Sequence, residues 1–94
     1  MFSTIVQKWQ EILFFMKNEF EIMDISYDTW LVPLKPYSLS GDKLYIIASE
    51  DNDQIRRIIR KKYEDLLSIA VLNVTGLKLF PVFMLKNEID DIET

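Results

Sequence analysis

Several residue types that carry chemistry are absent or scarce in this chain of 94 residues. It has no cysteine, which excludes a disulfide framework, a thiol nucleophile and a thiolate metal site. It has no histidine, which removes the commonest general base and the Ser-His-Asp and Cys-His catalytic arrangements. With two glycines, the chain contains neither a Walker A loop nor a dinucleotide-binding fingerprint. These absences predict a protein that is not an enzyme and holds no cofactor or metal.

Long apolar runs are also missing. No stretch approaches the roughly 18 apolar residues of a membrane span, and the first residues lack the basic start of a signal peptide. We therefore expect a cytoplasmic protein without a membrane partner. The length predicts one domain, and 49% hydrophobic with 13% aromatic residues predicts a packed core. The net charge of −4 disfavours non-specific coating of nucleic acid.

The chain begins with a predicted amphipathic helix that runs to about Phe20. Ser3 or Thr4 would cap its N-terminus. Phe14 and Phe15 fall on its polar half, so either sheet or loop covers them or they form an apolar contact surface for a partner. The residues that share one arc of the helix are Phe2, Ile5, Trp9, Ile12, Leu13, Met16 and Phe20. This arc predicts the side that faces the core.

A short helix and a β-hairpin follow. Asp24 or Ser26 would cap the helix, which ends before Pro33 because a residue preceding proline avoids helical conformation. Trp30 in this helix is either a core residue or a partly exposed binding aromatic. Gly41-Asp42 predicts a tight turn between strands 37–40 and 43–48. The second strand is apolar on both faces, which predicts a central position in the sheet.

A long helix is predicted from about Asp53 to Leu72, after an acidic loop that offers several possible caps. The residues expected on its inner side are Ile55, Ile58, Ile59, Tyr63, Leu66, Ile69 and Ala70. Its outward cations are Arg56, Arg57, Arg60 and Lys61. They form either a solvated face balanced by acidic neighbours or a surface that binds single-stranded nucleic acid.

The last predicted strand covers residues 77–85, after Gly76 closes the long helix. Pro81 cannot donate to a sheet ladder, so this strand is expected at a sheet edge or with a bulge. We divide the chain into an interaction domain at residues 1–86 and a frayed acidic tail or linker at residues 87–94. The fold class expected is α+β, in the order ααββαβ.

The order of these motifs resembles the N-terminal domain, domain I, of the bacterial replication initiator DnaA. The matching segments are Trp9 in the opening helix, Ser26-Tyr27-Asp28-Thr29-Trp30-Leu31-Val32-Pro33-Leu34, the Gly41-Asp42 hairpin, Arg60-Lys61-Lys62-Tyr63 and the closing strand. The resemblance covers about residues 5–85. It implies a KH-like fold with two N-terminal helices, a three-stranded sheet containing the hairpin, and a third long helix.

The resemblance also implies a function. In this family the domain is a non-enzymatic interaction module of replication initiation, which supports initiator self-association and docks the replicative helicase or regulatory proteins. A homodimer and weak contact with single-stranded DNA are further implied partners. The implied self-association residues are Trp9 and Leu13, and the implied partner surface is Ser26, Tyr27 and Thr29. Residues 48–54 differ from the family's Ala-Pro-Asn-x-Phe motif and lack its aromatic. Whether the chain is a segment of an initiator or a stand-alone relative is left open.

Overall fold

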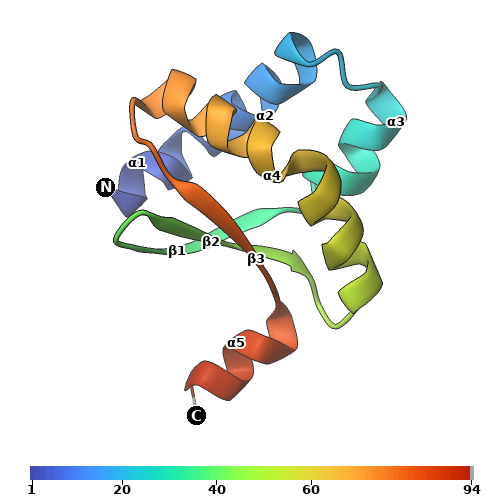
Figure 1. The fold of residues 1–94 in the computed structure, drawn as a ribbon, viewed down its shortest axis with the longest axis vertical. Helices are drawn as coiled ribbons and strands as arrows, with labels where there is room; N and C mark the ends of the chain where they lie inside the picture. The colour runs from blue at the N-terminus through green and yellow to red at the C-terminus, as the bar shows by residue number, and fades with distance from the viewer. Residues whose placement is uncertain (94) are drawn as a thin grey trace.

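A computed structural model describes the backbone of residues 1–93 and the side chains of residues 1–89. Helices pack on one face of a three-stranded sheet (Figure 1). In chain order the elements are α1 (Phe2–Gln7), α2 (Trp9–Glu19), α3 (Asp24–Ser26), the π-helical turn η1 (Tyr27–Leu31), β1 (Lys35–Ser40), β2 (Lys43–Ser49), α4 (Asp53–Thr75), β3 (Phe80–Leu85) and α5 (Lys86–Glu93). The predicted α+β, KH-like class and its order ααββαβ are confirmed, and α5 is an addition to it.

The sheet has the order β1-β2-β3, with β1 antiparallel and β3 parallel to β2. Its central strand is therefore β2, as its two apolar faces predicted. Gly41 has a φ of 61° between Ser40 and Lys43, the conformation that a two-residue primed turn requires of its first residue. β3 is an edge strand, which is the position that Pro81 allows.

The N-terminal helix is divided into α1 and α2 at Lys8, where the backbone leaves helical geometry at φ −99° and ψ 10°. Its predicted inner arc faces the core, where Ile5, Ile12 and Met16 are fully buried. The expected side-chain caps are wrong: Met1 precedes α1 and Met23 precedes α3, and neither caps a backbone N–H through its side chain. The helices begin there because tertiary burial fixes them, whatever the local capping preference.

α4 packs on α2, β2 and β3 and extends three residues beyond the prediction, to Thr75. Asn52 caps it by accepting hydrogen bonds from the backbone N–H groups of Gln54 and Ile55, and Gly76 ends it with a φ of 79°. The predicted inner arc is partly wrong, because Ile58 and Ile69 are 39% and 44% exposed. The buried face is rotated away from them and instead takes in Leu67 and Val71, since α4 is covered on one side by the sheet and on another by α2.

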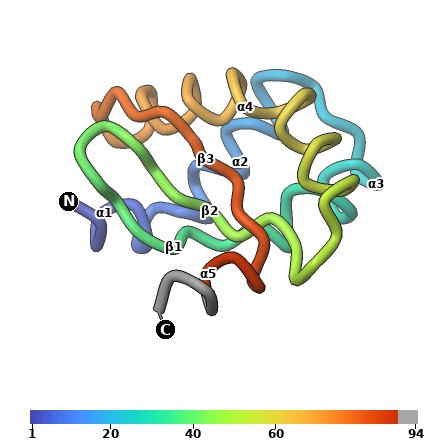
Figure 2. The backbone as a smooth tube through the Cα atoms, turned by 60° about the horizontal axis from the view of Figure 1, so that its bottom comes forward, coloured from blue at the N-terminus to red at the C-terminus, as the bar shows by residue number. Residues whose placement is uncertain are grey.

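α5 was not predicted; a frayed tail was expected in its place. Figure 2 shows it at the end of β3, below the sheet. Its start is fixed by Asn87, whose backbone N–H donates to the Glu50 carbonyl over 3.1 Å, and by Ile89, which is 5% exposed. The acidic side chains of Asp90, Asp91 and Glu93 and the whole of Thr94 lie outside the described part. The division of the chain at residue 86 stays a prediction.

Candidate functional site

Trp9 and Leu13, the implied self-association residues, lie in the core of this chain. They are 6% and 1% exposed, and the Trp9 indole N–H donates to the Leu34 carbonyl over 3.1 Å. The bond joins α2 to the residue before β1 and satisfies a buried acceptor. Their burial gives both side chains a packing role and leaves little of either exposed on the surface.

Phe14 and Phe15 have different surroundings, although they are adjacent in the sequence. Phe14 is 60% exposed on the outer side of α2. Phe15 is half-buried and meets Phe20 edge to face, with ring centroids 6.3 Å apart. Both phenylalanines, together with Val74 of α4, line a hollow of about 340 Å³ whose polar rim is Glu11, Asn18 and Glu19. An apolar floor with an acidic rim suits an apolar side chain carried by a basic segment.

The short helix formed by α3 and η1 presents the second implied surface. Ser26 and Tyr27 are half-buried and Thr29 is exposed. The Lys17 ammonium lies 4.9 Å from the centroid of the Tyr27 ring and 2.8 Å from the Asp24 carboxylate. The hydrogen bond from Lys17 lowers the pKa of Asp24, and the same bond raises the pKa of Lys17.

Lys17 also connects the two surfaces. It lies three residues after Phe14 on α2, so the two side chains are neighbours on the helix surface, and it covers Tyr27 on its other side. The exposed flank of α2 and the short helix therefore form one continuous surface. We call this the docking surface; its members are Phe14, Phe15, Lys17, Ile25, Tyr27, Thr29 and Val32.

Ile25 and Val32 were missed by the sequence analysis. Ile25 in α3 is 71% exposed, and Val32, which directly follows η1, is 51% exposed. The sequence left two roles open for Trp30, a core residue or a binding aromatic. In the structure it is half-buried against the core, with the Lys62 ammonium 5.9 Å from the centre of its ring.

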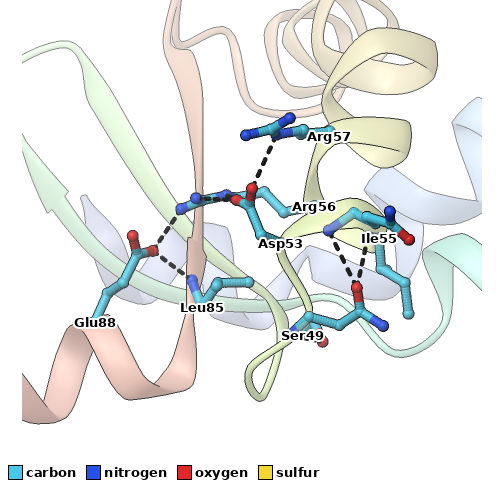
Figure 3. Close-up of polar contacts among 9 residues, drawn as sticks. Ser49, Asp53, Ile55, Arg56, Arg57, Leu85 and Glu88 are labelled. Atoms are coloured by element: carbon cyan, nitrogen blue, oxygen red, sulfur yellow. Dashed lines mark hydrogen bonds and ion pairs between the residues drawn. The ribbon is translucent and has the colours of Figure 1, made fainter.

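The three arginines of α4 are paired with acids, and Figure 3 shows the pairs of Arg56 and Arg57. Arg56 is tied to Asp53 and, over 2.5 Å, to Glu88 of α5. Arg57 lies 2.8 Å from the second oxygen of Asp53, and Arg60 lies 3.0 Å from Glu64. Three guanidinium groups thus face three carboxylates. Lys61 is exposed beside them.

These contacts shift several pKa values in the directions expected of ion pairs. The hydrogen bond from Arg56 lowers the pKa of Asp53. The backbone N–H of Leu85, 2.8 Å away, and the Arg56 guanidinium together lower the pKa of Glu88. Glu88 in turn raises the pKa of Arg56. Because the positive face is largely neutralised by its own chain, it offers little free charge to a phosphate backbone.

The free edge of β3 borders these arginines across a mixed-charge hollow of about 490 Å³. It is a poor template for an added strand. The Phe80 N–H donates inward to the Asp42 carbonyl, so by alternation the backbone amide positions of Pro81, Phe83 and Leu85 point to the open edge of the sheet. Pro81 has no N–H, and the N–H of Leu85 is bound by Glu88. Pro81 and Leu85 therefore offer no free N–H to an added strand.

The part of the chain that the structure describes contains no group of three potential metal ligands close enough to hold an ion. Nor does any helix described here have the length and apolar character to cross a membrane. The fold and surfaces define the class: a small α+β domain of KH-like arrangement, with most of its exposed large apolar side chains on the helices.

Comparison with known proteins identifies the family within this class. The chromosomal replication initiator protein DnaA of Lachnoclostridium phytofermentans is 37% identical over 76 residues, which are 79% of this chain and 17% of that protein. DnaA of Caldanaerobacter subterraneus subsp. tengcongensis is 32% identical over 76 residues, 81% of this chain and 16% of that protein. No profile of a protein family matches the chain. The chain is a DnaA N-terminal-domain-like protein that spans about a sixth of the length of these relatives.

Proposed function

We propose that this chain is a non-enzymatic, cytoplasmic interaction module of DNA replication initiation, which binds a protein partner through the docking surface. The observation that carries the proposal is the exposure of three apolar side chains there: Phe14 at 60%, Ile25 at 71% and Val32 at 51%. Apolar side chains held on helices and rimmed by polar groups are typical of binding surfaces. The relatives are replication initiators by name, which supports the process.

The proposed partners are an initiator of the DnaA type, the replicative helicase, or a protein that regulates either. The hollow beside Phe14 has a rim of Glu11 and Glu19. Its acidic character favours a partner segment with an apolar anchor flanked by lysine or arginine. Anchors of this kind contribute most of the binding energy at an interface, so a few substitutions should abolish capture.

The experiment immobilises the chain and measures capture of purified full-length initiator and helicase from the same organism. We expect capture of one of them, with affinity reduced at least tenfold by Phe14→Ser combined with Thr29→Arg. The matched control is Lys43→Ser, an exposed residue in the hairpin outside the docking surface. Circular dichroism checks that each variant is folded. Capture of neither protein, or equal capture by the double variant, would overturn the proposal.

The nucleic-acid alternative uses Arg56, Arg57, Arg60 and Lys61. It predicts single-strand binding that weakens steeply with salt and is lost when Arg57 and Arg60 are changed to Glu. The ion pairs of all three arginines count against it. Fluorescence anisotropy with a labelled oligonucleotide at low salt measures it, and absence of binding there eliminates it.

A further inference from the structure

The outer side of α4 carries a stripe that the docking surface does not use and that meets the core only through the half-buried Ile55. Its residues recur at alternating intervals of three and four, which is the seam spacing of a coiled coil. Ile58, Ile69 and Leu72 in it are 39%, 44% and 44% exposed. A row of exposed apolar residues on a long helix is a candidate contact surface when the core does not cover it. The full stripe, here named the α4 stripe, is Ile55, Ile58, Lys62, Asp65, Ile69 and Leu72.

The α4 stripe is complementary to a second copy of itself that runs in the opposite direction. Lys62 and Asp65 lie equally far from the point between Tyr63 and Glu64. Ile58 and Ile69 are also equidistant from that point, and so are Ile55 and Leu72. Turning the helix end for end therefore places apolar residues on apolar residues, and the lysine on the aspartate.

We propose that a second copy of this chain packs its α4 antiparallel against the first, about a two-fold axis at that point. Each Lys62 then faces Asp65 of the second copy, and Ile58 faces Ile69 of the second copy. An isologous interface requires this self-complementarity. Parallel pairing would instead place Lys62 against Lys62 and Asp65 against Asp65, so the charges select the antiparallel direction.

The geometry of α4 permits this contact. From Ile55 to Leu72 the helix rises about 26 Å at 1.5 Å per residue. This length holds six stripe residues, which the two-fold axis would relate as three facing pairs. Figure 2 shows α4 along the upper margin of the fold. Lys62 already lies 5.9 Å from the Trp30 ring and is exposed, so its ammonium remains available on the stripe. One helix pair is a small interface, and we expect a dimer that depends on protein concentration.

Sedimentation across a concentration series tests the proposal with charge exchange at two exposed positions. We expect the unchanged chain to reach twice the monomer mass at high concentration. Lys62→Asp and Asp65→Lys, made singly, each place like charges at the centre, and the dimer should be lost. The double variant Lys62→Asp with Asp65→Lys restores the opposite pairing, and so does an equimolar mixture of the two single variants.

The absence of cysteine allows the direction to be measured directly. An oxidised mixture of Ile58→Cys and Ile69→Cys chains should form a disulfide between the two variants, and neither variant should cross-link to itself. Self-linking of the Ile58→Cys chain would show a parallel arrangement and overturn the proposal.

Two further outcomes decide the proposal independently of the docking surface. Phe14→Ser lies outside the α4 stripe and should leave the dimer unchanged, whereas Ile58→Ser with Ile69→Ser should abolish it. A monomer at every concentration, or dimers unaffected by either charge reversal, would overturn it. Capture of an initiator or helicase by a strictly monomeric chain would do so while leaving the proposed function intact.

Discussion

Adjacent residues in this chain have opposite roles, and burial separates them. Leu13 is 1% exposed and Phe14 is 60% exposed. Rotation by about 100° per residue moves neighbours in a helix from one face to another, which is enough to divide core from surface. The chemistry of a side chain therefore does not reveal its role here; its angular position does.

Trp9 and Phe14 give the clearest contrast between core and surface. We expect Trp9→Phe to lower the free energy of unfolding by about 1–3 kcal/mol, because it leaves a void and an unpaired Leu34 carbonyl. Phe14→Ser should change it by less than about 0.5 kcal/mol. Urea denaturation followed by circular dichroism measures both. Equal effects of the two substitutions would contradict this division.

Glu88 predicts a pH-dependent effect. Its pKa is lowered in the folded protein by the Leu85 N–H and by Arg56. The unfolded chain therefore binds the proton first as pH falls, and the stabilisation is lost below the usual value of 4.5. Glu88→Gln should cost about 0.5–1 kcal/mol at pH 7, since the pair is partly exposed. The difference from the unchanged chain should shrink as pH falls through the folded pKa.

Unfolding curves at several pH values measure this difference. Glu11→Gln, an exposed residue of α2, is the control and should have little effect at neutral pH. A cost of Glu88→Gln that stays constant down to low pH would contradict the ion-pair explanation.

At the scale of elements, α4 dominates the fold: it packs on α2, β2 and β3, and α5 is tied to its first turn. Its two ends are defined locally, by the Asn52 side chain and by Gly76 in a left-handed conformation. Local signals of this kind are readable in a sequence because they need no distant partner. The rotation of the helix about its axis has no such signal, and this is why Ile58 and Ile69 were misplaced.

The Asn52 cap is expected to contribute measurably to stability. Asn52→Ala removes the acceptor for two backbone N–H groups and should cost about 1 kcal/mol. Asn52→Asp keeps an acceptor at the same place and serves as the matched control. Thermal unfolding of the two variants separates the cap from other effects of the position, and an equal loss in both would show that the cap contributes nothing.

On the scale of the whole molecule, one core extends from Ile5 to Phe83 and takes residues from α1, α2, the short helix, the sheet and α4. Leu85 and Ile89 are buried but lie outside this cluster. α5 is thus an added element that packs at the end of the sheet. Because α5 packs outside the main core, removing it tests the predicted domain boundary at residue 86.

We expect a chain ending at Leu85 to fold and to unfold cooperatively. It should lose about 1–3 kcal/mol, because the burial of Ile89 and the partner of Arg56 disappear. Calorimetry of the two chains measures the loss. A shortened chain without a cooperative transition would place α5 inside the domain.

The sequence by itself determined the elements from the N-terminal helix to β3, their order, the central position of β2 and the edge position of β3, but not the division of that helix at Lys8 or the presence of α5. These follow from periodicity, from turn residues such as Gly41 and from the missing N–H of Pro81, all of which act locally. Tertiary structure alone decided that Arg56 pairs with Glu88 of α5 and that Ile58, Ile69 and Leu72 of the α4 stripe are exposed. Each of these depends on which segments distant in the chain make contact, and a local sequence pattern does not determine those contacts.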